Sequence, residues 1–190
     1  MQEATKSFLG ERKRDLNMKK KSSLHLLVLT ALFGAMIFAV TAYILHIPTP
    51  ATGGYIHLGD ALVYLAASML PMPNAIAAAA IGEALSDALT GSVVYALPTL
   101  IIRAAMALCF TSAGARILTK RNIAACVAAG LICIGGYYLT EVLLLHSFMA
   151  PVAEIPGNVV QASASAVIYL LLGRALDRVK LKDSAAAMIR

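Results

Sequence analysis

Long apolar runs are the feature that most limits how this chain can fold. Of its 190 residues, 59% are hydrophobic and only 14% are charged, and the mean hydropathy is +0.77. These values lie well outside the range of ordinary globular domains. The runs are also too long and too frequent to pack as the core of one soluble domain. The sequence therefore predicts a membrane protein.

Six hydrophobic segments follow a polar, basic start at residues 1–23. The first run is too long for the h-region of a signal peptide and lacks an A-x-A-like exit, so we interpret it as a membrane span. We expect Asn74 to cap the third helix and Thr90-Gly91 to end it. The segments cover about residues 24–45, 58–70, 74–89, 98–118, 123–146 and 156–176.

These segments predict an all-α membrane protein with six transmembrane helices within residues 24–178. Residues 1–23 and 179–190 form its two tails. If both termini are cytoplasmic, 15 of the 16 Lys and Arg residues lie inside, as the positive-inside rule requires. The exception is Arg103, within the fourth segment. The net charge of +6 then reflects topology and anionic lipid, and it needs no nucleic-acid partner.

Polar residues within the spans gather at one depth, in the outer half of the predicted bundle. Ionisable side chains there are costly and usually face the bundle interior or a water-filled cavity. A shared depth therefore favours a pocket that opens to the outside. Its expected substrate-binding residues are Tyr55, His57, Asp60, Glu83, Asp87, Arg103, Glu141, Asn158 and Gln161.

Structural roles remain open for several of these residues. Arg103 could form a buried salt bridge with Glu83 or Asp87, and Asp60 could cap the second helix. Interhelical hydrogen bonds would equally explain the polar residues of the last two segments, Glu141, Asn158 and Gln161. The uncharged loop before the second segment contains Gly53 and Gly54, and we expect it to form a movable lid.

Three stretches carry a family resemblance: GGYIHLGDALVYLAA, AAAAIGEALSDALTGSVVYALPTLIIRAAMAL and IPGNVVQ. Over residues 24–178 the chain resembles the S components of energy-coupling factor (ECF) vitamin transporters, in the riboflavin and hydroxymethylpyrimidine branch. The resemblance implies a six-helix binding subunit in a bacterial plasma membrane, which takes up a vitamin or precursor. It also implies partners: a membrane-embedded T component and two ATPase subunits that hydrolyse ATP.

The family couples to its partner through an A-x-x-x-A stripe on the first helix. Here TALFGAMIFA places Ala31, Ala35 and Ala39 on one helical face. Small residues let another helix approach closely within lipid. The stripe is thus expected to dock the T component, although packing against this chain's own helices would use the same spacing.

Other classes of function find less support in the sequence. The chain lacks G-x-S-x-G, H-E-x-x-H and G-x-x-x-x-G-K motifs, so we expect neither an enzyme nor a self-energised pump. We expect no cofactor and no metal, since the Glu83 and Asp87 pair alone is a weak cation signal. Cys109, Cys126 and Cys133 are interpreted as buried apolar residues. A stand-alone secondary carrier or channel remains the alternative.

The ligand itself is only broadly constrained. Tyr55, Tyr95, Tyr137 and Tyr138 lie near the outer side and could stack on a heterocycle. The chain has no Trp. With so few large rings, we expect a small one-ring vitamin or precursor, such as a pyrimidine or pyridine, in preference to a flavin.

Overall fold

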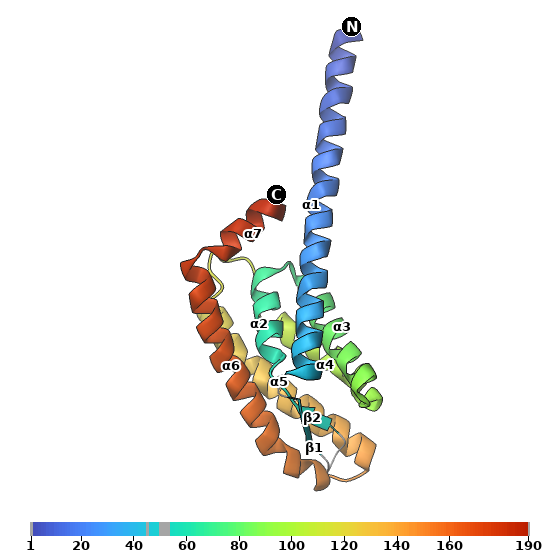
Figure 1. Ribbon diagram of the computed structural model, residues 1–190, viewed down its shortest axis with the longest axis vertical. Helices are drawn as coiled ribbons and strands as arrows, with labels where there is room; N and C mark the ends of the chain where they lie inside the picture. The colour runs from blue at the N-terminus through green and yellow to red at the C-terminus, as the bar shows by residue number, and fades with distance from the viewer. Residues whose placement is uncertain (1, 45, 50–53, 190) are drawn as a thin grey trace.

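A computed structural model describes residues 2–44, 46–49 and 54–189 of the chain. Nearly all of the described chain is helical (Figure 1). Gly53, expected in the lid, lies outside the described residues. The elements are α1 (Gln2–Tyr43), β1 (Ile47–Thr49), β2 (Gly54–Ile56), α2 (Asp60–Met69), α3 (Met72–Thr90), η1 (Val93–Tyr95), α4 (Ala96–Leu108), α5 (Lys120–Leu145), η2 (Ala150–Glu154), α6 (Ile155–Arg178) and α7 (Leu181–Ile189).

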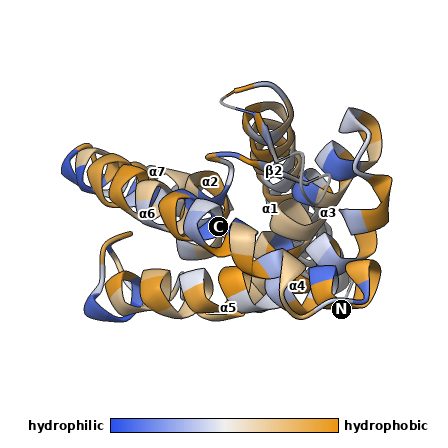
Figure 2. Ribbon diagram, turned by 90° about the horizontal axis from the view of Figure 1, so that it is seen from below, coloured by the Kyte–Doolittle hydropathy of each residue, from blue (hydrophilic) through white to orange (hydrophobic). Residues whose placement is uncertain are grey.

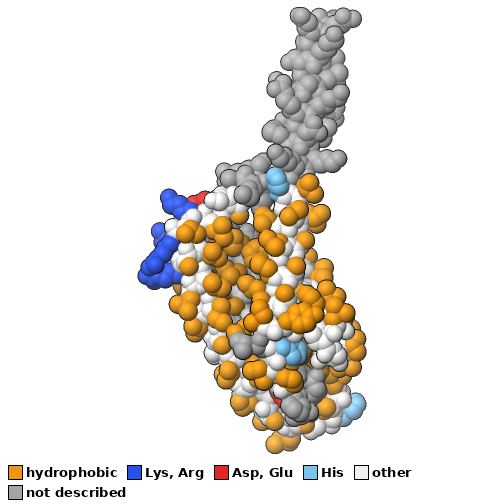
Figure 3. Space-filling model, viewed as in Figure 1, with side chains coloured by type: hydrophobic (Ala, Val, Ile, Leu, Met, Phe, Trp, Pro, Cys, Tyr) orange, Lys and Arg blue, Asp and Glu red, His pale blue; other side chains and the backbone are white. Residues whose placement is uncertain are grey.

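Among the described residues, three helical stretches are long and apolar enough to cross a bilayer: Ser22–Tyr43, Lys120–Leu145 and Ala150–Arg178. Asp60–Met69 and Val93–Leu108 are apolar but shorter. Large apolar side chains on these helices face outward, and Leu131, Leu143 and Leu171 are each about two-thirds exposed or more. Figure 2 shows how much of the helical ribbon is hydrophobic. Figure 3 shows apolar side chains over most of one face of the molecule, with Lys and Arg gathered near α7. Such a surface suits lipid, so the chain is a multi-pass membrane protein.

Helix α1 is longer than the sequence predicted. It runs for 42 residues without a break, or about 63 Å at 1.5 Å per residue. Its N-terminal half projects beyond the rest of the molecule (Figure 1). The basic start at residues 2–23 therefore continues the first span as one helix.

Close backbone contact joins α1 to α3. A Cβ atom on Gly82 would lie 2.8 Å from the carbonyl oxygen of Gly34 and 3.1 Å from the Ile37 side chain. Glycine at this position therefore allows the two helices to cross without a gap.

Deeper in the core, Tyr64 stacks on Phe110 with ring centroids 4.9 Å apart, and Tyr169 meets Tyr64 edge-on at 5.9 Å.

Two short strands occupy the segment that we expected to be a loop. Strands β1 and β2 pair antiparallel, with Ile47 opposite Ile56. The hairpin lies at the end of the molecule away from both termini (Figure 1). Pairing satisfies backbone N–H and C=O groups of both strands.

Helix α4 ends ten residues before the predicted boundary at Leu118. Side chains from α5 and α6 bond the backbone of residues 109–119 and hold it in a non-helical conformation. Asn122 accepts a hydrogen bond from the Thr111 backbone N–H at 2.9 Å and donates to the carbonyl oxygens of Thr111 and Ile117. Asp177 accepts from the backbone N–H groups of Ile117 and Leu118 at 2.7 and 3.0 Å.

The two predictions for the ends of α3 had opposite outcomes. Gly91 ends the helix in the left-handed conformation, with φ of 96°, so that prediction is confirmed. The prediction for Asn74 is wrong, because α3 begins at Met72 after Pro71. Asn74 instead donates a hydrogen bond to Thr30 Oγ1 of α1 at 2.9 Å. The N-cap residue of α3 is Pro71, which forms no side-chain cap hydrogen bond.

Candidate functional site

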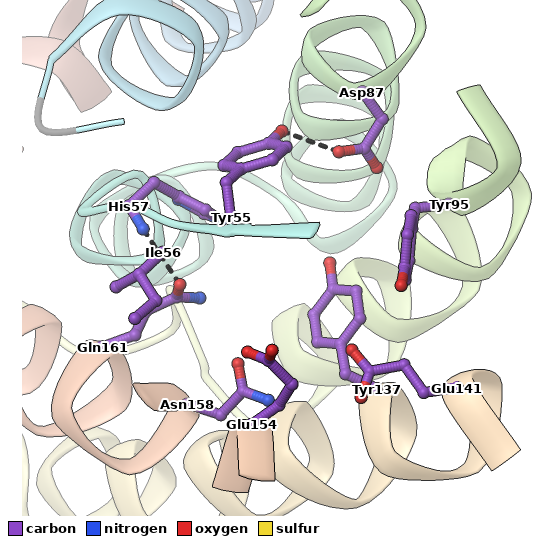
Figure 4. A pocket seen from close by; sticks show the side chains of 10 residues that line it. All are labelled: Tyr55, Ile56, His57, Asp87, Tyr95, Tyr137, Glu141, Glu154, Asn158 and Gln161. Atoms are coloured by element: carbon purple, nitrogen blue, oxygen red, sulfur yellow. Dashed lines mark hydrogen bonds between the residues drawn. The ribbon is translucent and has the colours of Figure 1, made fainter. Parts of the chain in front are cut away.

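A polar pocket opens at the hairpin end of the molecule (Figure 4). The wall is built from β2, the ends of α3 and α5, and the start of α6. The lining residues are Tyr55, Ile56, His57, Asp87, Tyr95, Tyr137, Glu141, Glu154, Asn158 and Gln161.

Tyr55 fixes the hairpin against α3. Its hydroxyl donates to Asp87 Oδ1 at 2.6 Å and lies 3.1 Å from Ser86 Oγ. The ring stacks on His46 with centroids 3.9 Å apart. Burial, together with the Asp87 carboxylate, raises the pKa of Tyr55, so the phenol stays a neutral donor. The hairpin is thus a bonded wall of the pocket.

Gln161 forms the floor and joins three elements. Its Oε1 accepts from the backbone N–H of His57 at 3.0 Å, and its Nε2 donates to Asp60 Oδ2 at 3.0 Å. The side chain is almost completely buried. Helix α6 is therefore tied at this point to α2 and to the segment between β2 and α2.

A buried ionic cluster lies beneath that floor, centred on Arg103. Its guanidinium forms an ion pair with Asp60 through Nη1, and Nη2 lies 3.9 Å from Glu83 Oε2. His57 Nε2 lies 3.1 Å from Nη2. The cluster extends to α1, because Thr41 Oγ1 donates to Glu83 Oε1 at 3.0 Å.

The cluster resolves two of the open structural alternatives. Arg103 is completely buried and pairs with Glu83, as one alternative proposed, but its closest partner is Asp60, which we had not considered. The alternative role of Asp60 as a helix cap is wrong, since the N-cap of α2 is Gly59 and Asp60 bonds Gln161 and Arg103 instead.

The cluster also includes a possible set of metal ligands. Donor atoms of His57, Asp60 and Glu83 lie within 4.8 Å of one another. The Arg103 guanidinium contacts all three side chains, so it already occupies the place of a cation. Cys133, which we had assigned to the apolar core, borders this cluster with Sγ 3.9 Å from Asp60 Oδ2.

Two acids stand at the opposite side of the pocket, on α5 and η2. Glu141 and Glu154 are only 4% and 8% exposed. Glu141 Oε2 has no hydrogen-bond partner among the described residues. The sequence prediction missed Glu154, although a signal was present: it is the only Asp or Glu in the three connections assigned to the outside.

The predicted site residues thus divide between two layers. Asp60, Glu83 and Arg103 belong to the buried cluster and do not line the pocket. Tyr138 is also absent from the lining, and its hydroxyl donates to the Phe148 carbonyl oxygen at 3.0 Å. The residues that line the pocket as predicted are Tyr55, His57, Asp87, Glu141, Asn158 and Gln161, joined by Tyr95 and Tyr137 from the predicted aromatic faces.

The alanine stripe runs along α1 and is not part of the pocket lining. Ala31, Ala35 and Ala39 are all exposed, whereas Phe33 and Ile37 on the other face are buried in the core. The stripe therefore faces away from the chain's own helices.

Comparison with known families identifies the architecture. The profile for the ECF-type riboflavin transporter S component matches residues 21–178, which is most of the chain. The chain belongs to this S-component family. The resemblance seen in the sequence is thereby confirmed. A search of curated proteins found no matching relative.

Membership of the family decides the class of function. The S component is a membrane subunit that binds substrate for vitamin uptake. It is a transporter subunit and not an enzyme. The stand-alone carrier or channel is not favoured.

Proposed function

We propose that the S component captures a small vitamin or vitamin precursor from outside the cell in the pocket between β2, α3, α5 and α6. One observation carries this proposal: polar side chains line a pocket at one end of the molecule. This end lies away from both termini (Figure 1), and the outer surface of the helices is apolar. Polar groups at such a depth are costly unless they meet water or a ligand. Asn158 supports the assignment, since it is a half-buried amide in the pocket wall.

The proposed topology has six crossings with both termini in the cytoplasm. Helices α2 and α4 have 10 and 13 residues, or about 15 and 20 Å, short of a ~30 Å hydrocarbon core. They would cross only with the help of the flanking segments, and any non-helical backbone at membrane depth would have to be covered by protein or line a water-filled cavity. The charge distribution supports this orientation, because Lys and Arg gather near the termini and around the start of α5, as the positive-inside rule requires of cytoplasmic segments.

Transport through the bilayer would require partners. We propose that the exposed stripe of Ala31, Ala35 and Ala39 docks a T component, which joins the S component to two ATPase subunits in a bacterial plasma membrane. Small exposed residues allow a partner helix to approach closely, where lipid provides no hydrophobic drive. The position of the stripe on the outer face of α1 supports this role.

Uptake with and without the energising module tests the function. Cells that express the S component together with a T component and ATPases should accumulate a labelled vitamin, and cells that lack the module should not. Mass spectrometry of molecules that co-purify with the protein would identify the vitamin. Equal accumulation without the module would instead establish a stand-alone carrier.

A further inference from the structure

Buried acids greatly outnumber cations at the pocket end of the S component. Arg103 is the only Lys or Arg of this end among the described residues. Five acids surround the pocket and the cluster beneath it, and each has less than a tenth of its surface exposed: Asp60, Glu83, Asp87, Glu141 and Glu154.

The ion pairs of the single guanidinium are with acids beneath the floor. Arg103 pairs with Asp60 and Glu83, and Asp87 receives the Tyr55 hydroxyl. Among the described residues, neither Glu141 nor Glu154 has an ion-pair partner. An uncompensated carboxylate in a buried site costs on the order of several kcal/mol, so this side of the pocket favours a positive charge.

Glu141 also has an oxygen without a hydrogen bond. Its Oε2 is buried and has no partner within the described part of the chain, although buried carboxylate oxygens normally accept at least one bond. Figure 4 shows the Glu141 side chain beside Tyr137 at the pocket, with Glu154 and Asn158 nearby. A ligand that donates hydrogen bonds would satisfy this oxygen.

Aromatic rings adjoin the two acids. Tyr95 and Tyr137 have ring centroids 6.4 Å apart and are tilted by 51°. The guanidinium carbon of Arg103 lies 5.4 Å from the centroid of the Tyr137 ring. Ring faces that remain open to the pocket can contact a flat ligand, and aromatic faces attract cations. Carboxylates beside aromatic rings form a surface that attracts aromatic cations and repels anions.

We propose that the pocket selects a positively charged ligand with a single aromatic ring, whose charge faces Glu141 and Glu154. This inference rests on the proposed function, since it assigns a charge to the substrate of the same pocket. The amides of Asn158 and Gln161 complete the lining and hold the polar substituents of the ring.

Matched ligand pairs test the preference on purified protein in a non-ionic detergent. One pair is 1-methyl-3-carbamoylpyridinium and nicotinamide, and the other is benzylammonium and benzyl alcohol. Each pair shares its ring and differs in charge. Titration calorimetry and thermal melts should show at least tenfold tighter binding of the cation than of its neutral partner in at least one pair.

Charge-removing variants assign the preference to these acids. Glu141→Gln and Glu154→Gln should each reduce the cation preference by about tenfold, and either variant suffices if the other fails to fold. Asp183→Asn is the control, because Asp183 is exposed on α7, and it should keep the parental preference.

Three outcomes would overturn the inference: neutral partners that bind as tightly as the cations, cations that do not bind, or a preference unchanged in both variants. Module-dependent uptake of a neutral vitamin such as riboflavin, without cation binding, would overturn this inference but leave the proposed function standing. Cation binding without any module-dependent uptake would contradict the proposed function alone.

Discussion

Gln161 Nε2 lies 3.0 Å from Asp60 Oδ2, although 101 positions separate the two residues in the chain. The same amide accepts the backbone N–H of His57. One side chain of α6 thereby separates the pocket above from the Arg103 cluster below. Because both partners are buried, its removal would leave polar groups unbonded on each side.

Gln161→Leu should therefore destabilise the protein and weaken ligand binding together. An unmet buried hydrogen bond costs about 1 to 3 kcal/mol, so the melting temperature should fall by several degrees. Ser163→Ala is a matched control on the same helix, since Ser163 is exposed. A parental melting temperature for Gln161→Leu would contradict the structural role of this bond.

Arg103→Met should be the most destabilising single change in the cluster. It leaves Asp60 and Glu83 buried without a cation, at a cost of about 3 to 5 kcal/mol. The double variant Arg103→Met/Asp60→Asn should recover part of the loss, because it also removes a negative charge. Thermal melts in detergent compare the three proteins, and a double variant no more stable than Arg103→Met would refute the pairing.

Asn158→Ala separates ligand binding from stability. Loss of its amide should weaken binding by about ten- to hundredfold, while the protein remains monodisperse and melts near the parental temperature. Isothermal titration beside a thermal melt provides both readings. Normal affinity with a lowered melting temperature would remove Asn158 from the binding site.

Ala35→Trp should abolish uptake and leave the affinity of the isolated S component nearly unchanged, because Ala35 is exposed on α1 and does not line the pocket. Val167→Trp is a suitable control, since Val167 is 56% exposed on α6 and outside the stripe. Equal loss of uptake in both variants would indicate general crowding in the membrane.

Cysteine labelling tests the proposed orientation. In a variant with Cys109, Cys126 and Cys133 replaced by Ala, a membrane-impermeant reagent added outside should label Thr52→Cys and not Lys120→Cys. Thr52 lies outside the described residues, and its assignment to the outside comes from the sequence. The reverse pattern would invert the topology.

The sequence predicted the positions of most helices, because apolar run length is a local property. It also predicted that several polar residues from separate helices gather in one region, and six of them line the pocket. It did not predict which acid would pair with Arg103, since Asp60 and Glu83 are brought together only when α2, α3 and α4 pack. The end of α4 at Leu108 was missed for a similar reason. Its apolar continuation resembles a helix, but Asn122 at the start of α5 and Asp177, 60 positions further along the chain than Ile117, bond that backbone instead.

The unbroken course of α1 has a mechanical consequence. A continuous helix transmits a change of tilt along its whole length, since bending it would break backbone hydrogen bonds. With about 30 Å of helix beyond the span, a 10° change in tilt would displace its far end by about 5 Å. A spin label near Gln2 would therefore be displaced by several ångströms when the tilt of the helix face that carries Ala35 changes by this amount.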